Sequence, residues 1–164
     1  MKKILIGLVV VLALAGVGIW QFSGSAKTAP DVTFTSLSGE KITMQELRGK
    51  VVLVKFWATS CVTCIAQMPD TIQYYNTLSP KGFDTIAVAM QYDPANYVKN
   101  YAETRKLPFT VAIDAQGEIA KAFGDVKLTP TAFLIDKQGH IIKRYLGNYD
   151  KAEFLSTVNK ALAS

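Results

Sequence analysis

The sequence from residue 51 to residue 64 reads VVLVKFWATSCVTC and is the most informative segment of the chain. Its first seven residues are almost all apolar and either β-branched or aromatic, which is typical of a central strand covered on both faces. A helical pattern follows from about residue 62 to residue 78. Cys61 and Cys64 therefore straddle a strand-to-helix junction at the carboxyl end of the strand. Open α/β sheets place their ligand chemistry at such junctions.

Strand and helix patterns alternate on both sides of this junction. Asp93-Pro94 is a good helix start, with Asp93 as the N-cap of a helix running to about Arg105. Asp150 and Glu153 have capping-box spacing at the start of the last helix. The alternation predicts an α/β domain with a mixed sheet and helices on both faces. The other expected elements are strands at 32–34, 41–43, 83–90, 110–113, 132–135 and 141–146, and a short helix at 118–123.

Composition limits the function classes. The chain has 164 residues, of which 49% are hydrophobic and 19% charged, so it suits one domain with a real core and excludes a disordered or fibrous chain. Two cysteines and one histidine are too few for a disulfide-stapled miniprotein or a histidine-rich metal site. The formal charge is +5, without a basic run interleaved with aromatic residues, so nucleic-acid binding gets no support.

The N-terminal segment differs from the rest. The chain carries no charge from Ile4 to Trp20, and the apolar stretch through Phe22 is close to the ~20 residues that cross a bilayer. Lys2 and Lys3 would keep the N-terminus on the cytoplasmic side. We expect residues 1–22 to form a transmembrane signal-anchor, in preference to a cleaved signal. Residues 23–31 would then be a linker and residues 32–164 the exported domain.

The two cysteines carry the chemical information. A thiolate at Cys61 would be stabilised by the free N–H groups and the positive dipole end of a helix. Cys64, one turn further along, should be more buried and can close a small disulfide, so the pair suits thiol–disulfide exchange. Three alternatives stay open: half of a zinc site with His140, two inert buried thiols, and a structural disulfide.

Thr129-Pro130 is a second candidate feature. Proline cannot donate to a strand ladder, so Pro130 marks the mouth of the strand that follows. If the bond is cis, Thr129 can offer its backbone groups to an extended substrate strand beside Cys61. An ordinary trans proline is the alternative.

These segments resemble the TlpA/ResA/DsbE group of thioredoxin-like proteins. The likeness rests on KFWATSCVTC at 55–64, Met68-Pro69, and TPTAFLID at 129–136, and it covers about Val32 to Leu162. It implies a thioredoxin-like fold with an N-terminal hairpin and a central strand–helix insertion, which the stretch 91–123 can hold. It also implies a cis-proline and a domain tethered to the bacterial inner membrane, facing the periplasm.

The sequence departs from this group around the cysteines. Ser60 stands where tryptophan is usual, and Val62-Thr63 where proline often occurs. Gln67 stands where a glutamate is common, and a glutamine side chain cannot titrate. Lys55 takes the place of the buried aspartate of thioredoxin, and its charge would favour the thiolate of the pair. In the alternative, the Lys55 ammonium reaches water.

We therefore expect Cys61 to be the nucleophile and Cys64 the resolving thiol. Trp57 would shield the pair, and Thr129-Pro130 would position the substrate. No cofactor or metal is expected beyond the redox-active disulfide.

The resemblance implies protein thiols and disulfides as partners, with apocytochromes c or copper-delivery proteins as clients of a reductase. It also implies a membrane electron donor of the DsbD/CcdA type, and we expect a monomer. The alternatives are a net thiol oxidant, and a copper or haem chaperone that uses the cysteines as ligands.

Overall fold

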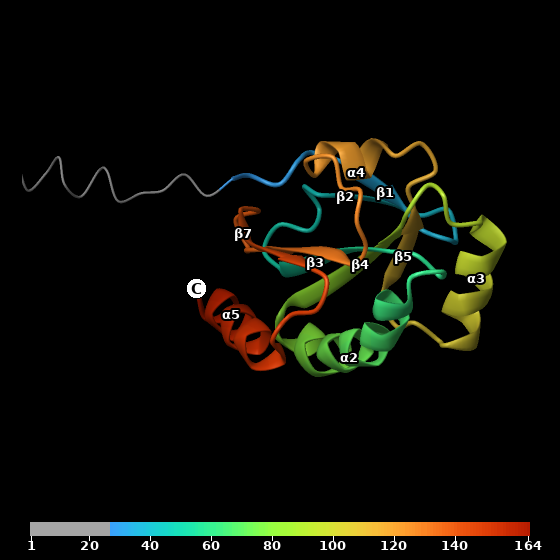
Figure 1. Cartoon of the computed structure of the whole chain (residues 1–164). Helices are drawn as coiled ribbons and strands as arrows, with labels where there is room; N and C mark the ends of the chain where they lie inside the picture. The colour runs from blue at the N-terminus through green and yellow to red at the C-terminus, as the bar shows by residue number, and fades with distance from the viewer. Residues whose placement is uncertain (1–26) are drawn as a thin grey trace, which may run out of the picture.

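A computed structural model describes residues 27–164 (Figure 1). A five-stranded sheet forms its centre, in the order β5-β4-β3-β6-β7. The strands are β3 (Val51–Trp57), β4 (Phe83–Ala89), β5 (Thr110–Ile113), β6 (Thr131–Ile135) and β7 (Ile141–Leu146).

The sheet is mixed, as predicted. β3, β4 and β5 are parallel, whereas β6 is antiparallel to β3 and β7 is antiparallel to β6. All seven residues of β3 are buried, because β3 lies in the middle of the sheet and both of its faces are covered. The apolar run at 51–57 thus correctly predicted a central strand.

Helices and a hairpin cover the two faces (Figure 1). On one face lie α4 (Glu118–Ala122) and the hairpin of β1 (Thr33–Thr35) and β2 (Lys41–Thr43), which bury Phe34, Ile119 and Phe123 against the sheet. On the other face lie α2 (Val62–Leu78), followed by the short η1 (Ser79–Lys81), and α5 (Lys151–Ala163). Phe154 of α5 and Tyr74 of α2 pack there with rings 4.9 Å apart.

The stretch 91–123 contains α3 (Ala95–Thr104), β5 and α4, which confirms the expected insertion. Its strand extends the sheet beside β4. One detail is wrong: Pro94, not Asp93, is the N-cap of α3, and no side chain caps this helix. The Asp93 carboxylate instead accepts hydrogen bonds from Thr59, in the loop that precedes Cys61.

The chain is already paired at Lys27–Ala29. Ala29 N donates to Gly139 O at 2.9 Å, and Ile141 N donates to Lys27 O at 2.8 Å. Folded contacts therefore begin upstream of Val32. Within residues 27–164, no helix is both long enough and apolar enough to cross a bilayer. The predicted anchor at 1–22 lies outside the described residues.

Candidate redox site

Cys61 and Cys64 form a disulfide at the start of α2, with their Cα atoms 5.2 Å apart. Cys61 is the N-cap of the helix, in an extended conformation, and its sulfur accepts a hydrogen bond from Cys64 N at 3.2 Å. Ile65 N donates to Cys61 O at 3.0 Å, which begins the helical ladder. The sulfur therefore lies where free helical N–H groups converge, as the sequence predicted.

The two sulfurs differ in exposure. Cys64 is fully buried, whereas Cys61 is half-buried and Val62 beside it is 83% exposed. An incoming thiol or disulfide can therefore reach Cys61 but not Cys64. This asymmetry matches the expected division between an attacking and a resolving cysteine.

Trp57 packs beneath the pair. It is fully buried in one apolar cluster with Cys64 and Met68, against which Cys61 also packs. Its ring lies 5.3 Å from that of Tyr101 on α3. Because Trp57 has no exposed surface, it can affect a substrate only through the residues packed on it.

The Thr129–Pro130 peptide bond is cis. Phe56 pairs with Thr131 across β3 and β6, so Pro130 lies beside Trp57 at the carboxyl end of β3. Pro130 O accepts from Gly147 N at 2.9 Å. Within residues 27–164, neither backbone polar group of Thr129 has a hydrogen-bond partner. Both groups are thus free to pair with an added strand.

Lys55 does not reach water, so that alternative is wrong. The side chain is fully buried between β3 and α2. Its Nζ donates to Gln67 Oε1 at 3.0 Å and to Thr71 Oγ1 at 3.1 Å. Gln67 and Thr71 lie about one and two turns beyond Cys64 on α2. The ammonium therefore sits under the helix that carries the disulfide.

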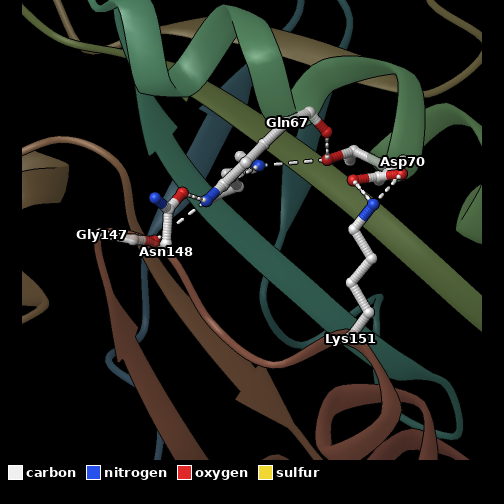
Figure 2. Close-up of polar contacts among 7 residues, drawn as sticks. Gln67, Asp70, Gly147, Asn148 and Lys151 are labelled. Atoms are coloured by element: carbon white, nitrogen blue, oxygen red, sulfur yellow. Dashed lines mark hydrogen bonds and ion pairs between the residues drawn. The ribbon is translucent and has the colours of Figure 1, made fainter.

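Gln67 links this buried cation to the loop before α5 (Figure 2). Its Nε2 donates to Gly147 O at 3.0 Å and to Asn148 Oδ1 at 3.1 Å. Because Gly147 N bonds Pro130 O, the chain of hydrogen bonds runs from Lys55 through α2 to the cis-proline. Gln67 cannot titrate, and its side chain connects the Lys55 ammonium to the loop before α5.

Burial lowers the pKa of Lys55 from 10.5 to about 8, and the negative charge of Asp70 acts in the opposite direction. Asp70 is itself paired with Lys151 at 2.7 Å (Figure 2). At neutral pH, Lys55 is thus mostly protonated. Lys55 therefore places a positive charge under α2, the helix that carries the disulfide, and its pKa is close to neutral pH.

Asp93 and Tyr92 are contacts that the sequence did not predict. Asp93 is only 4% exposed and accepts from Thr59 N at 2.6 Å and from Thr59 Oγ1 at 2.5 Å. Tyr92 Oη lies 3.3 Å from Thr129 Oγ1. The only sequence signal was the Asp-Pro pair, which equally fits a helix cap, so a partner 34 residues away was not predictable.

A zinc site shared with His140 is wrong. β6 begins at Thr131, near the disulfide, and ends beside Val52. The hairpin with His140 therefore lies at the opposite end of the sheet, about 16 Å along β3. His140 Nδ1 is 3.2 Å from Asp136 Oδ2. In the described part of the chain, no three His, Cys, Asp or Glu side chains gather as metal ligands.

A cysteine pair that closes and opens at a helix N-terminus can accept and return two electrons. The sheet around it has the thioredoxin arrangement, with the cis-proline beside the central strand. This site and this fold define a thioredoxin-like thiol:disulfide oxidoreductase.

The comparisons with known proteins agree. A family model described as Redoxin matches residues 24–162, so the chain belongs to the redoxin family. It is 36% identical to the thiol-disulfide oxidoreductase ResA of Bacillus cereus, over 97% of this chain and 96% of that protein. It is 33% identical to the thioredoxin-like protein YneN of Bacillus subtilis, over 76% and 73% of the two chains.

Solved structures show the same fold. A thiol:disulfide interchange protein of the thioredoxin family from Chlorobium tepidum superimposes with a TM-score of 0.77 at 30% identity. The match covers 85% of this chain and 99% of that one. The recognised likeness to the ResA and DsbE type is thus confirmed.

Proposed function

We propose that the protein is an exported, membrane-anchored oxidoreductase that exchanges disulfides with protein cysteines, acting as a reductase. The observation that carries this proposal is the asymmetry of the pair: a reachable Cys61 at the helix N-terminus beside a buried Cys64. The relatives named thiol-disulfide oxidoreductase support the same chemistry.

The reaction transfers one electron pair. In the reduced protein, the Cys61 thiolate attacks one sulfur of a client disulfide, forming a mixed disulfide and releasing the client's other sulfur as a thiolate, which takes up a proton. Cys64 then loses its proton and attacks the Cys61 sulfur. The mixed disulfide breaks, the second client sulfur leaves as a thiol, and the Cys61–Cys64 disulfide forms. The client gains the two electrons that the pair loses.

Thr129 and Pro130 position the client in this proposal. The unpaired backbone groups of Thr129 can bond an extended segment on either side of the client cysteine, as in the addition of a strand to a sheet edge. Trp57 forms a buried apolar floor beneath the pair.

A net oxidant is the second candidate, because of one observation. The buried ammonium of Lys55 lies under the redox helix and favours a thiolate over a neutral thiol. Stabilising the reduced form makes the disulfide a stronger oxidant. The midpoint potential of the pair against glutathione separates the two candidates: a value below the glutathione couple supports a reductase, and a value well above it supports an oxidant.

Substitution of the two cysteines tests the chemistry. Cys61→Ser should abolish the reduction of insulin disulfides, whereas Cys64→Ser should trap a mixed disulfide with the client. Activity of Cys61→Ser near that of the parent would refute the proposal. Stoichiometric copper or haem bound to the reduced parent, together with no turnover, would favour the chaperone alternative instead.

The compartment and the partners belong to the proposal as well. Residues 1–22 would anchor the protein in the bacterial inner membrane with the domain in the periplasm, and a DsbD/CcdA-type donor would reduce it. Apocytochromes c or copper-delivery proteins would be its clients. Extraction of the full chain at alkaline pH tests the anchor, because an anchored chain stays with the membrane pellet. Mixed disulfides trapped by Cys64→Ser in cells would identify the clients.

A further inference from the structure

The loop between β4 and α3 contacts both of the loops between which a client would lie in the proposed function. Two neighbouring residues of this loop make these contacts. Asp93 bonds Thr59, two residues before Cys61, and Tyr92 bonds Thr129, directly before the cis-proline. No other described hydrogen bond joins one short segment to both of these loops.

The Asp93 contact is a clamp on the redox loop. Its two carboxylate oxygens accept from the N–H and the hydroxyl of the same residue, Thr59. A nearly buried carboxylate is tolerated only where its oxygens are bonded, and such bonds are among the stronger ones in proteins. Backbone bonds from Met90 N to Trp57 O and from Asp93 N to Met90 O hold the two loops in the same register.

The Tyr92 contact reaches the opposite side. The Tyr92 side chain is 54% exposed, so nothing in its own packing requires the hydroxyl to lie at Thr129. Thr129 in turn carries the backbone groups that are free to receive a strand. One loop thus contacts both the segment before Cys61 and the residue that carries the strand-binding backbone.

We propose that Tyr92 and Asp93 are positioning residues that fix the spacing between the Cys61 sulfur and the strand-binding backbone for extended polypeptide clients. The inference rests on the client-binding role of Thr129 and Pro130 in the proposed function. A polypeptide must engage Thr129 and present its sulfur to Cys61 at the same time, so it benefits from a preset distance. A small disulfide needs only Cys61, and its reaction should not depend on the spacing.

Asp93→Asn tests the proposal in the full-length chain. An asparagine can keep the two contacts only as neutral hydrogen bonds, with its amide nitrogen donating to the Thr59 hydroxyl, so the charge-assisted hold on the loop is weakened. With insulin as substrate and dithiothreitol as reductant, we expect KM to rise about tenfold with kcat nearly unchanged. The rate with 2-hydroxyethyl disulfide should stay within about twofold of the parent's, because the Cys61 thiolate itself is untouched.

Tyr92→Phe is a second variant that keeps the ring on an exposed position and removes only the hydroxyl. We expect the same pattern at a smaller size, about two- to threefold in KM for insulin. Asp114→Asn is the matched control. Asp114 is as buried as Asp93, at 3% exposure, but accepts from Ile119 N and Ala120 N of α4. It should lower stability without changing the KM for insulin.

Three results would overturn the inference. One is an equal loss with insulin and with the small disulfide, which would mean that Asp93 acts on Cys61 itself. Another is an unchanged KM in Asp93→Asn, and the third is a similar rise in Asp114→Asn. A failure of the proposed function looks different, because the parent itself would then reduce neither disulfide, or Cys61→Ser would reduce both.

Discussion

At the residue scale, the least expected feature is a charged lysine with no access to water. Lys55 is the fifth of the seven residues of β3, and its hydrogen bonds to Gln67 and Thr71 replace part of its hydration. The likeness to thioredoxin indicated that the residue at position 55 lies near the cysteine pair. It did not indicate where the Lys55 ammonium lies. Burial depends on the partners that α2 brings, and those partners are 12 and 16 residues away in the sequence.

The lowered pKa of Lys55 predicts how stability changes with pH. Below about pH 8, Lys55 is protonated in both the folded and the unfolded chain, so the cost of burying its charge is fully present. Between about 8 and 10.5 the unfolded chain binds more protons than the folded one, so the free energy of unfolding rises with pH. The gain is about 3 kcal/mol at most.

Urea denaturation across this pH range measures the effect. Lys55→Met should lack the rise, whereas the parent should show it. Lys50→Met is the matched control, since Lys50 is half-exposed, pairs with Asp84, and lies just before the other end of β3. The interpretation would be wrong if all three proteins kept the same pH dependence.

The same lysine should influence thiolate formation at Cys61. Removing its positive charge in Lys55→Met should raise the pH midpoint of thiolate absorbance by about one unit, the size of the effect of one partly screened charge. Lys50→Met should leave the midpoint where it is. An unchanged midpoint in Lys55→Met would mean that Lys55 is structural and would remove the support for a net oxidant.

At the element scale, most helices and strands followed the sequence pattern because local and tertiary preferences agree. α2 occupies the predicted range 62–78, and β5 the predicted range 110–113. The start of α3 is where they disagree. Asp93 has the chemistry of a helix cap, but Thr59 offers it two donors in a buried place, and this tertiary contact prevails over capping.

The last helix shows the opposite outcome. Asp150 caps α5 as predicted, accepting from Glu153 N at 2.7 Å. Asp150→Ala should therefore lower the free energy of unfolding by about 1 kcal/mol in urea denaturation. Ser156→Ala, on the exposed side of the same helix, is the control and should have little effect. A null result for Asp150→Ala would show that packing of Phe154 alone fixes the helix start.

At the scale of the whole molecule, the sheet separates two ends with different tasks. The redox pair and the cis-proline meet at the carboxyl end of β3, whereas the segment Lys27–Ala29 binds the β6–β7 hairpin at the other end. The fold class and the redox pair were predictable because a strand pattern and two cysteines are local signals. The distance between the loop before Cys61 and the cis-proline loop was not predictable, since it depends on three loops from distant parts of the chain.

The pairing of Lys27–Ala29 predicts where the stable domain begins. A fragment of residues 32–164 lacks the Ala29–Gly139 and Lys27–Ile141 backbone bonds and the buried Ala29 side chain. It should be about 2 kcal/mol less stable than a fragment of residues 27–164. Urea denaturation of the two fragments checks this, and equal stability would show that the segment contributes nothing to the fold.

Selective alkylation of the reduced protein measures the difference in reactivity between Cys61 and Cys64. Iodoacetamide at neutral pH, followed by mass spectrometry of the peptides, gives a separate rate for each cysteine. Cys61 should react well before Cys64 and faster than the thiol of an unfolded peptide, because its sulfur is reachable and lies at a helix N-terminus. Equal rates at both cysteines, or a Cys61 no faster than the peptide thiol, would contradict the account.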